Sequence, residues 1–187
     1  MSEPGYVSGF IDTVSAAVRA VAPEFGLRER PADAFVTSHA AISSGWGRST
    51  LAAKHFNLFG IKAGPTWTGP TVDLMTTDYS KAGVPTTHVQ RWRVYPSFEA
   101  CIRDHLRLVM TTPRYAASAK LLRASSLEYM AQMGRDGWYS SSQVGHVSAE
   151  WQAGVRRVVK YQGIRLLSGA GVATWAIGGA LLAWALS

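Results

Sequence analysis

The sequence predicts a mainly α-helical domain with a small β-hairpin lobe, followed by a C-terminal transmembrane helix. Three observations lead to this prediction. Apolar residues recur at helical spacing over most of the chain, two segments within residues 66–95 alternate apolar and polar residues, and residues 166–187 carry no charge. We expect the domain to cover residues 1–163 and the membrane segment residues 164–187. At 187 residues, the chain is long enough to bury a hydrophobic core.

The N-terminal part of the chain favours three helices. A first amphipathic helix is predicted over residues 7–21, where valines and a phenylalanine recur every three or four residues. A second helix is predicted from Pro31 to Ser44, because the sequence Gly45-Trp46-Gly47 breaks the pattern with two flexible residues. A short third helix follows at residues 51–55.

The middle of the chain changes to a strand pattern. Residues 72–77 alternate apolar and polar side chains, residues 89–95 do the same, and Lys81-Ala82-Gly83 provides a turn between them. This pattern predicts a β-hairpin. Helical spacing then returns and predicts helices over residues 98–110, 116–133 and 147–161.

Composition limits the classes of partner. The formal charge of +7 suits a polyanionic partner such as a bacterial wall, an anionic membrane surface or nucleic acid, but no nucleic-acid motif is present. Aromatic residues make up 11% of the chain, with seven tryptophans, which is typical of sugar-binding clefts and membrane interfaces. Cys101 has no second cysteine to pair with, and the scattered histidines lack metal-site spacing. We therefore expect no metal and no cofactor.

The two ends of the chain differ in character. Residues 1–10 lack the basic region and apolar core of a signal peptide. The uncharged segment 166–187 is long enough to cross a hydrocarbon core of ~30 Å, so we expect a tail anchor, with a buried C-terminal helix as the alternative. Basic residues cluster just before the segment, which by the positive-inside rule favours a cytoplasmic domain. They are Arg156, Arg157, Lys160 and Arg165.

Several uncommon motifs occur in a fixed order along the chain. Ser44-Gly45-Trp46-Gly47 is followed by NLFGIKAG at residues 57–64, TTDY at residues 76–79, RVYPSFEA at residues 93–100 and PRY at residues 113–115. This order resembles the glucosaminidase family of peptidoglycan hydrolases, glycoside hydrolase family 73, which includes the hydrolase domain of the flagellar rod protein. The resemblance covers roughly residues 7–161. It implies a lysozyme-like α+β fold, with the hairpin as one lip of a cleft that holds peptidoglycan glycan strands.

The resemblance also implies where catalysis should occur. Glycoside hydrolysis commonly needs two carboxyl groups, one of which protonates the leaving oxygen. The family's acid is a glutamate immediately before the serine of SGWG, and Ser43 stands in that position. A serine hydroxyl is too weak an acid for this role, and either a natural substitution or an engineered inactivating one accounts for it. Asp78 matches the second carboxylate, where the family more commonly has a glutamate, and the alternative is a solvated residue at the end of a strand. His39 lies one helical turn before Ser43 and is a candidate replacement donor, the alternative being a partly buried histidine without a catalytic role.

Aromatic residues supply the remaining candidate site. We expect Trp46, Trp67, Tyr115, Phe59 and His39 to contact the sugar. Core packing is the alternative for Trp46 and Tyr115, and shaping of the turn is the alternative for Phe59. One further departure from the family is the loose form of its C-terminal GYATD-like turn, which appears at residues 137–142 without the aspartate.

Three functions from different classes follow. The first is a membrane-anchored endo-β-N-acetylglucosaminidase that cleaves the β-1,4 bond on the reducing side of N-acetylglucosamine at the bacterial cell envelope, reached through a phage lysis hole or as cargo of an injection particle. The second is a catalytically inactive module that binds peptidoglycan or has a structural part in a phage lysis or injection assembly. In the third, the groove is filled and only protein partners bind. Ser43 weakens the first function. Binding without turnover would indicate the second, and failure to bind chitooligosaccharides would indicate the third.

Overall fold

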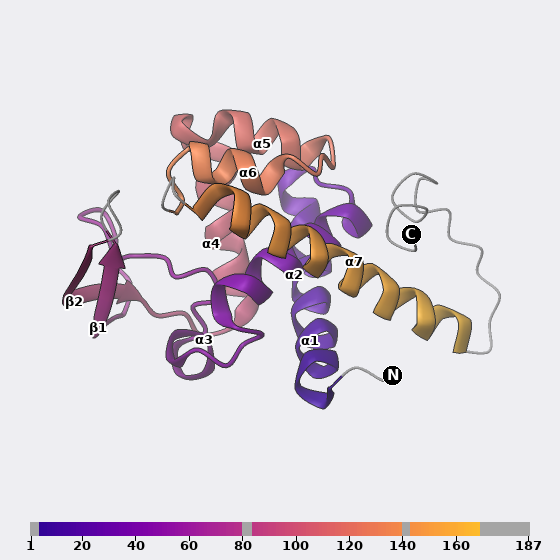
Figure 1. Cartoon of the computed structure of the whole chain (residues 1–187), viewed down its shortest axis with the longest axis horizontal. Coiled ribbons are helices and arrows are strands. Elements are labelled where there is room, and N and C mark those ends of the chain that lie inside the picture. The colour runs from indigo at the N-terminus through magenta and orange to yellow at the C-terminus, as the bar shows by residue number, and fades with distance from the viewer. Residues whose placement is uncertain (1–3, 80–83, 140–142, 169–187) are drawn as a thin grey trace.

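The computed structural model describes residues 4–79, 84–139 and 143–168 (Figure 1). Its elements, in chain order, are α1 (Gly5–Val21), η1 (Ala22–Phe25), α2 (Glu29–Ser44), α3 (Thr50–His55), β1 (Thr71–Tyr79), β2 (Pro85–Arg93), α4 (Phe98–Thr111), η2 (Pro113–Tyr115), α5 (Ala116–Arg123), α6 (Tyr129–Arg135) and α7 (Val144–Ser168). The predicted mainly α architecture with one hairpin is confirmed, and it fits a lysozyme-like α+β fold.

Helix α2 forms the centre of the helical body. Its residues 32–41 are buried, because α1 packs on one side of it and α7 on another. The indole Nε1 of Trp151 in α7 donates a hydrogen bond of 3.0 Å to the carbonyl oxygen of Phe35, and the two rings meet edge to face at 4.8 Å. A Cβ atom at Gly154 would lie 3.3 Å from the Cβ of Ser38. The glycine therefore lets α7 approach α2 closely.

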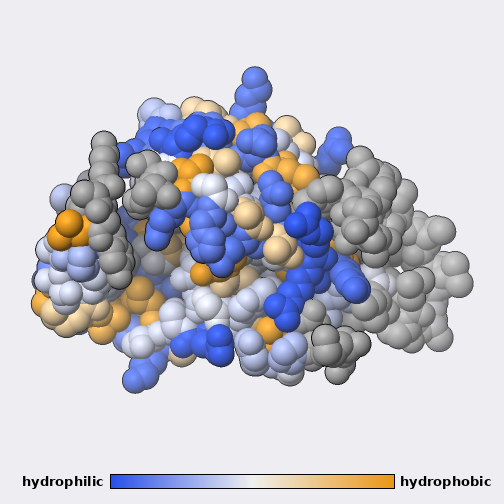
Figure 2. All heavy atoms as spheres, viewed as in Figure 1, coloured by the Kyte–Doolittle hydropathy of each residue, from blue (hydrophilic) through white to orange (hydrophobic). Residues whose placement is uncertain are grey.

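The hairpin extends from one end of the molecule (Figure 1). Strands β1 and β2 pair antiparallel over nine residues each, with Met75 opposite Val89. These two side chains are 66% and 61% exposed. On the face shown in Figure 2, hydrophilic side chains alternate with small hydrophobic patches, and hydrophobic atoms are visible at the end where the hairpin lies. The hairpin thus has little apolar core of its own.

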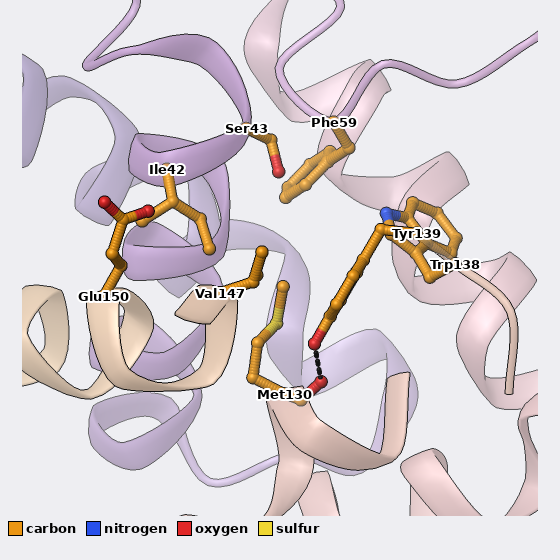
Figure 3. Close-up of a pocket in the computed structure, with 8 residues that line it drawn as sticks. All are labelled: Ile42, Ser43, Phe59, Met130, Trp138, Tyr139, Val147 and Glu150. Atoms are coloured by element: carbon orange, nitrogen blue, oxygen red, sulfur yellow. Dashed lines mark hydrogen bonds between the residues drawn. The ribbon is translucent and has the colours of Figure 1, made fainter. Parts of the chain in front are cut away.

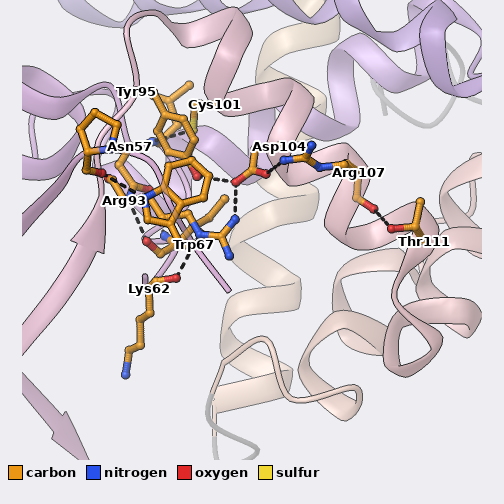
Figure 4. A network of polar contacts seen from close by, with 12 residues as sticks. Asn57, Lys62, Trp67, Arg93, Tyr95, Cys101, Asp104, Arg107 and Thr111 are labelled. Atoms are coloured by element: carbon orange, nitrogen blue, oxygen red, sulfur yellow. Dashed lines mark hydrogen bonds and ion pairs between the residues drawn. The ribbon is translucent and has the colours of Figure 1, made fainter. Parts of the chain in front are cut away.

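A buried charge network attaches the hairpin to α4 (Figure 4). Asp104 accepts hydrogen bonds from Arg93 at 2.6 Å, from the Tyr95 hydroxyl at 2.7 Å, and from Arg107. Burial would raise the pKa of the Asp104 carboxyl, but the bonds from Tyr95, Arg107 and Arg93 outweigh burial and lower this pKa below its ordinary value. The Arg93 guanidinium also lies 4.5 Å from the ring centroid of Trp67. The network therefore fixes the base of the hairpin, where β2 ends at Arg93, against α4.

One predicted helix divides in two. The pattern of residues 116–133 predicts a continuous helix, but α5 ends at Arg123 and α6 begins at Tyr129. Ser125 adopts the left-handed conformation with φ 53°, and the Ser126 amide donates to the Leu121 carbonyl at 2.9 Å. This is the hydrogen-bond pattern of a Schellman-type helix end. Serine is an uncommon residue for that conformation, so the helical spacing on both sides concealed the break.

The predicted transmembrane helix is wrong for the part of the chain that the structure describes. Residues 164–168, assigned to its start, continue α7, which begins at Val144 and includes Arg156, Arg157 and Lys160. No helix within the described ranges is both long and apolar enough to cross a membrane. The helical pattern was predicted to end at residue 161, whereas α7 continues without a break to Ser168, so the start of the uncharged window belongs to a helix that carries charged residues. The rest of the predicted segment, residues 169–187, lies outside the described residues.

Two buried histidines lie behind the C-terminal end of α2. His39 and His105 are fully buried, with ring centroids 4.9 Å apart, and none of their ring nitrogens has a hydrogen-bond partner among the described residues. Burial lowers the pKa of His39 to about 3, and burial together with the nearby His39 lowers that of His105 well below its ordinary value. Both imidazoles are therefore neutral at pH 7 and act as core side chains.

Mild acid should destabilise the fold through these histidines. Their unfolded pKa is about 6.5, so below that pH the unfolded chain binds more protons than the folded one. The free energy of unfolding should fall as pH decreases from 7 to 5, by up to about 1.4 kcal/mol per pH unit for each histidine. Urea unfolding at pH 7, 6 and 5 measures the slope. His39→Leu should reduce the slope, and Val36→Ala, a buried change on the same helix that removes no titratable group, should not. A stability independent of pH over this range would contradict the assignment.

Candidate active site

The C-terminal end of α2 is made by three consecutive left-handed residues. Gly45, Trp46 and Gly47 have φ values of 58°, 60° and 78°. The Trp46 amide donates to the Ala41 carbonyl at 2.8 Å, and the Gly47 amide donates to the Ser44 Oγ at 2.8 Å. A Cβ at Gly47 would lie 2.9 Å from a Phe10 ring carbon, so only glycine fits there. The turn therefore ends α2 at Ser44, and its hydrogen bonds fix the conformation of the chain after the helix.

Ser43 is exposed in the last turn of α2 and lines a pocket of about 270 Å³ (Figure 3). The pocket is lined mainly by apolar and aromatic side chains from α2, α6 and α7 and the connecting segments. Its lining residues are Ile42, Ser43, Phe59, Met130, Trp138, Tyr139, Val147 and Glu150. Since a side chain longer than serine at this position would extend into this space, the pocket has room for the carboxyl group that the resemblance leads one to expect.

Glu150 is the carboxylate among these lining residues, and the sequence analysis did not find it. It projects from α7, with Ile42 between it and Ser43 in Figure 3, and its Oε1 lies 3.4 Å from Nε2 of His146. No motif surrounds Glu150. A glutamate on the solvent side of an amphipathic helix is common, and only the packing of α7 on α2 brings this one to the pocket.

Trp138 and Tyr139 form the opposite wall. They follow Gly137, which has φ 83°, in the stretch that loosely matches the family's C-terminal turn. The Tyr139 hydroxyl donates a hydrogen bond to the Met130 carbonyl, and burial raises the pKa of Tyr139 to about 12. Tyr115 packs edge to face behind Trp138 at 5.5 Å and is not among the residues that line the pocket.

The two aromatic rings predicted near Ser43 have different positions. Phe59 lines the pocket and stacks on His105, with centroids 3.9 Å apart. His39 lies deeper, edge to face with Phe59 at 5.2 Å, and has no exposed surface. A neutral imidazole with its pKa lowered to about 3 is not a proton donor near pH 7. The structure therefore does not bring His39 to the pocket.

Asp78 and Trp67 belong to the hairpin lobe. The Asp78 Oδ2 lies 3.2 Å from the Lys62 Nζ and 3.6 Å from the His88 Nε2, and its side chain is 53% exposed. The Trp67 Nε1 donates to the Pro70 carbonyl at 3.0 Å. Neither residue is among those that line the pocket at Ser43. The predicted site is thus divided between the end of α2 and the hairpin.

Trp46 is not among the residues that line the Ser43 pocket. Its ring meets Phe10 edge to face at 5.8 Å and lies 5.1 Å from the Arg157 guanidinium of α7. It lines a second pocket between α2 and α7, in which Ile42 and Glu150 also take part. The two pockets therefore adjoin.

Known proteins similar in sequence include a peptidoglycan hydrolase and a probable N-acetylmuramidase. The chain is 29% identical over 144 residues to peptidoglycan hydrolase FlgJ of Escherichia coli K12, a match that covers 75% of this chain and 44% of FlgJ. It is 34% identical over 128 residues to a probable N-acetylmuramidase of Lactococcus lactis strain IL1403, covering 65% of this chain and 27% of that protein. The chain thus spans less than half the length of these relatives.

Solved structures share the fold. A peptidoglycan hydrolase mutant from Sphingomonas sp. A1 superposes with a TM-score of 0.68 at 25% identity, over 82% of this chain and 99% of that one. The glycoside hydrolase domain of Salmonella typhimurium FlgJ gives a TM-score of 0.63 at 18% identity, over 88% and 96% of the two chains, and supports the fold alone. The family model Glucosaminidase, described as mannosyl-glycoprotein endo-beta-N-acetylglucosaminidase, matches residues 22–176. Because this match covers most of the sequence, the chain belongs to the Glucosaminidase family of glycoside hydrolases.

Proposed function

We propose that this chain is the glycan-cleaving domain of a peptidoglycan hydrolase that acts at the bacterial cell envelope. Its reaction is hydrolysis of the β-1,4 bond on the reducing side of N-acetylglucosamine. The observation that carries the proposal is the pocket at the end of α2, with the SGWG sequence forming the helix end and Ser43 at the position of the family's acid. Family membership and the wall hydrolases among its relatives support the same substrate.

The residue at position 43 determines how fast this reaction runs. General acid catalysis contributes a factor of ~10²–10⁴, which corresponds to roughly 3–5 kcal/mol of barrier lowering. Ser43 does not supply it. The site retains the apolar and aromatic walls that raise the pKa of a catalytic carboxyl group and keep it protonated. We therefore expect slow cleavage by the chain as it stands.

A glycan-binding module without turnover is the second candidate. Two observations favour this candidate: Ser43 cannot act as the acid, and the pocket beside it is open. If side chains filled the groove, no glycan could bind there. In this role the chain would hold wall glycan for an envelope-crossing assembly of the lysis or injection type. Binding without release of reducing ends separates this candidate from the hydrolase.

Restoring the carboxyl group should restore catalysis. Ser43→Glu should raise the rate of reducing-end release from purified peptidoglycan by at least ~10², because it returns the general acid to its pocket. Ser43→Gln is the matched control, with nearly the same size and no acidic proton. If Ser43→Glu is no faster than Ser43→Gln, the pocket at Ser43 is not the catalytic site.

Asp78 should act as the second carboxylate. In the Ser43→Glu background, Asp78→Asn should lower the rate by ~10² or more, since an amide cannot activate water or stabilise the positive transition state as a carboxylate does. Asp73→Asn, on the same strand and paired with Arg91, is the control and should leave the rate unchanged. Equal rates for the Asp78 and Asp73 variants would remove Asp78 from the reaction.

A further inference from the structure

A second pocket of about 340 Å³ lies between the end of α2 and the middle of α7. Its lining residues are Ala41, Ile42, Gly45, Trp46, Glu150, Ala153, Gly154 and Arg157. Ile42 and Glu150 also line the pocket at Ser43, so the two pockets adjoin along α7. A molecule that occupies the first pocket can extend a substituent into the second.

Trp46, the aromatic residue of this second pocket, has a strained backbone conformation. It has φ 60°, a conformation that is rare for bulky residues and strains the backbone. Glycine or asparagine would adopt it more easily. The backbone bond to Ala41 and the ring contacts with Phe10 and Arg157 compensate for this strain. Backbone strain of this kind concentrates at ligand sites, so the ring has a role that a small residue would not fulfil.

Opposite charges stand at the two ends of the pocket. Glu150 and Arg157 are seven residues apart on α7, which is two helical turns or about 10 Å along the helix axis. Small residues of α2 and α7 lie between them, including Ala153 and Gly154. The surface therefore presents a carboxylate, an aromatic ring and a guanidinium to one elongated ligand.

These charges suit a peptide better than a sugar. The N-acetylglucosamine units of wall glycan are neutral, whereas the short peptide stems on the lactyl groups of its muramoyl units carry free carboxylates and amide or ammonium N–H groups. A guanidinium binds a carboxylate through two parallel hydrogen bonds. We infer that the second pocket binds the peptide stem of a muramoyl unit beside the cleavage site, with Arg157 on a stem carboxylate, Glu150 on a stem N–H, and Trp46 against its apolar atoms. This inference rests on the proposed function, since the stem arrives with the glycan.

Binding to two soluble fragments tests the inference. The first is N-acetylglucosaminyl-N-acetylmuramoyl-tetrapeptide, and the second is the same disaccharide with its lactyl carboxyl capped as a methylamide. Calorimetric titration of the full chain should give about tenfold tighter binding of the tetrapeptide form, as expected for one charge-assisted contact. Arg157→Gln should bring the two affinities together. Lys160→Gln, which removes the same charge from an exposed position on α7, should preserve the difference.

Arg157→Lys provides a second variant in case the glutamine disturbs the contact with Trp46. It keeps the charge without the guanidinium fork and should retain only part of the preference. Equal affinity of the unmodified chain for the two fragments, or an unchanged preference in Arg157→Gln, would overturn the inference and leave the proposed function intact. If neither fragment binds and Ser43→Glu does not cleave peptidoglycan, the proposed function fails, and the inference fails with it.

Discussion

The site depends on the way α2 ends. Three residues in succession adopt the left-handed conformation, and only the outer two are glycines, so Trp46 between them is held by its amide bond to Ala41 and by ring contacts. Because α2 ends here, Ser43 is exposed to the first pocket and the Trp46 ring lines the second. Two adjoining pockets are the result. A helix that continued by one more turn would have neither.

Helix α7 completes both pockets. The Trp151 bond to Phe35 and the close approach at Gly154 hold α7 against α2, and this packing places Glu150 between the pockets and Arg157 at the far end of the second. The neutral imidazoles of His39 and His105 fill the core behind the end of α2. The core behind the site therefore carries no charge from these two histidines, and the charged side chains of the site, Glu150 and Arg157, lie on α7.

Local patterns predicted the elements whose causes are local. The spacing of apolar residues predicted α1, α2 and α4, and the alternation of apolar and polar residues predicted the hairpin. The order of the motifs predicted that Ser43 lies at the end of a helix. Features that arise from contacts between distant segments were not predictable in this way. Glu150 reaches the site only through the packing of α7, and His39 shares a helix with Ser43 but points into the core. The uncharged C-terminal segment suggested a separate membrane span, but its first described residues continue α7, a helix whose earlier part carries charged side chains.

The reducing end that cleavage creates identifies the linkage that the site breaks. Peptidoglycan digested by the Ser43→Glu chain is reduced with borohydride, hydrolysed, and analysed for amino-sugar alcohols by mass spectrometry. A glucosaminidase site predicts glucosaminitol, because the bond on the reducing side of N-acetylglucosamine is the one that breaks. Muramitol as the main product would rule out a glucosaminidase site and assign the pocket at Ser43 to the other β-1,4 linkage of the wall.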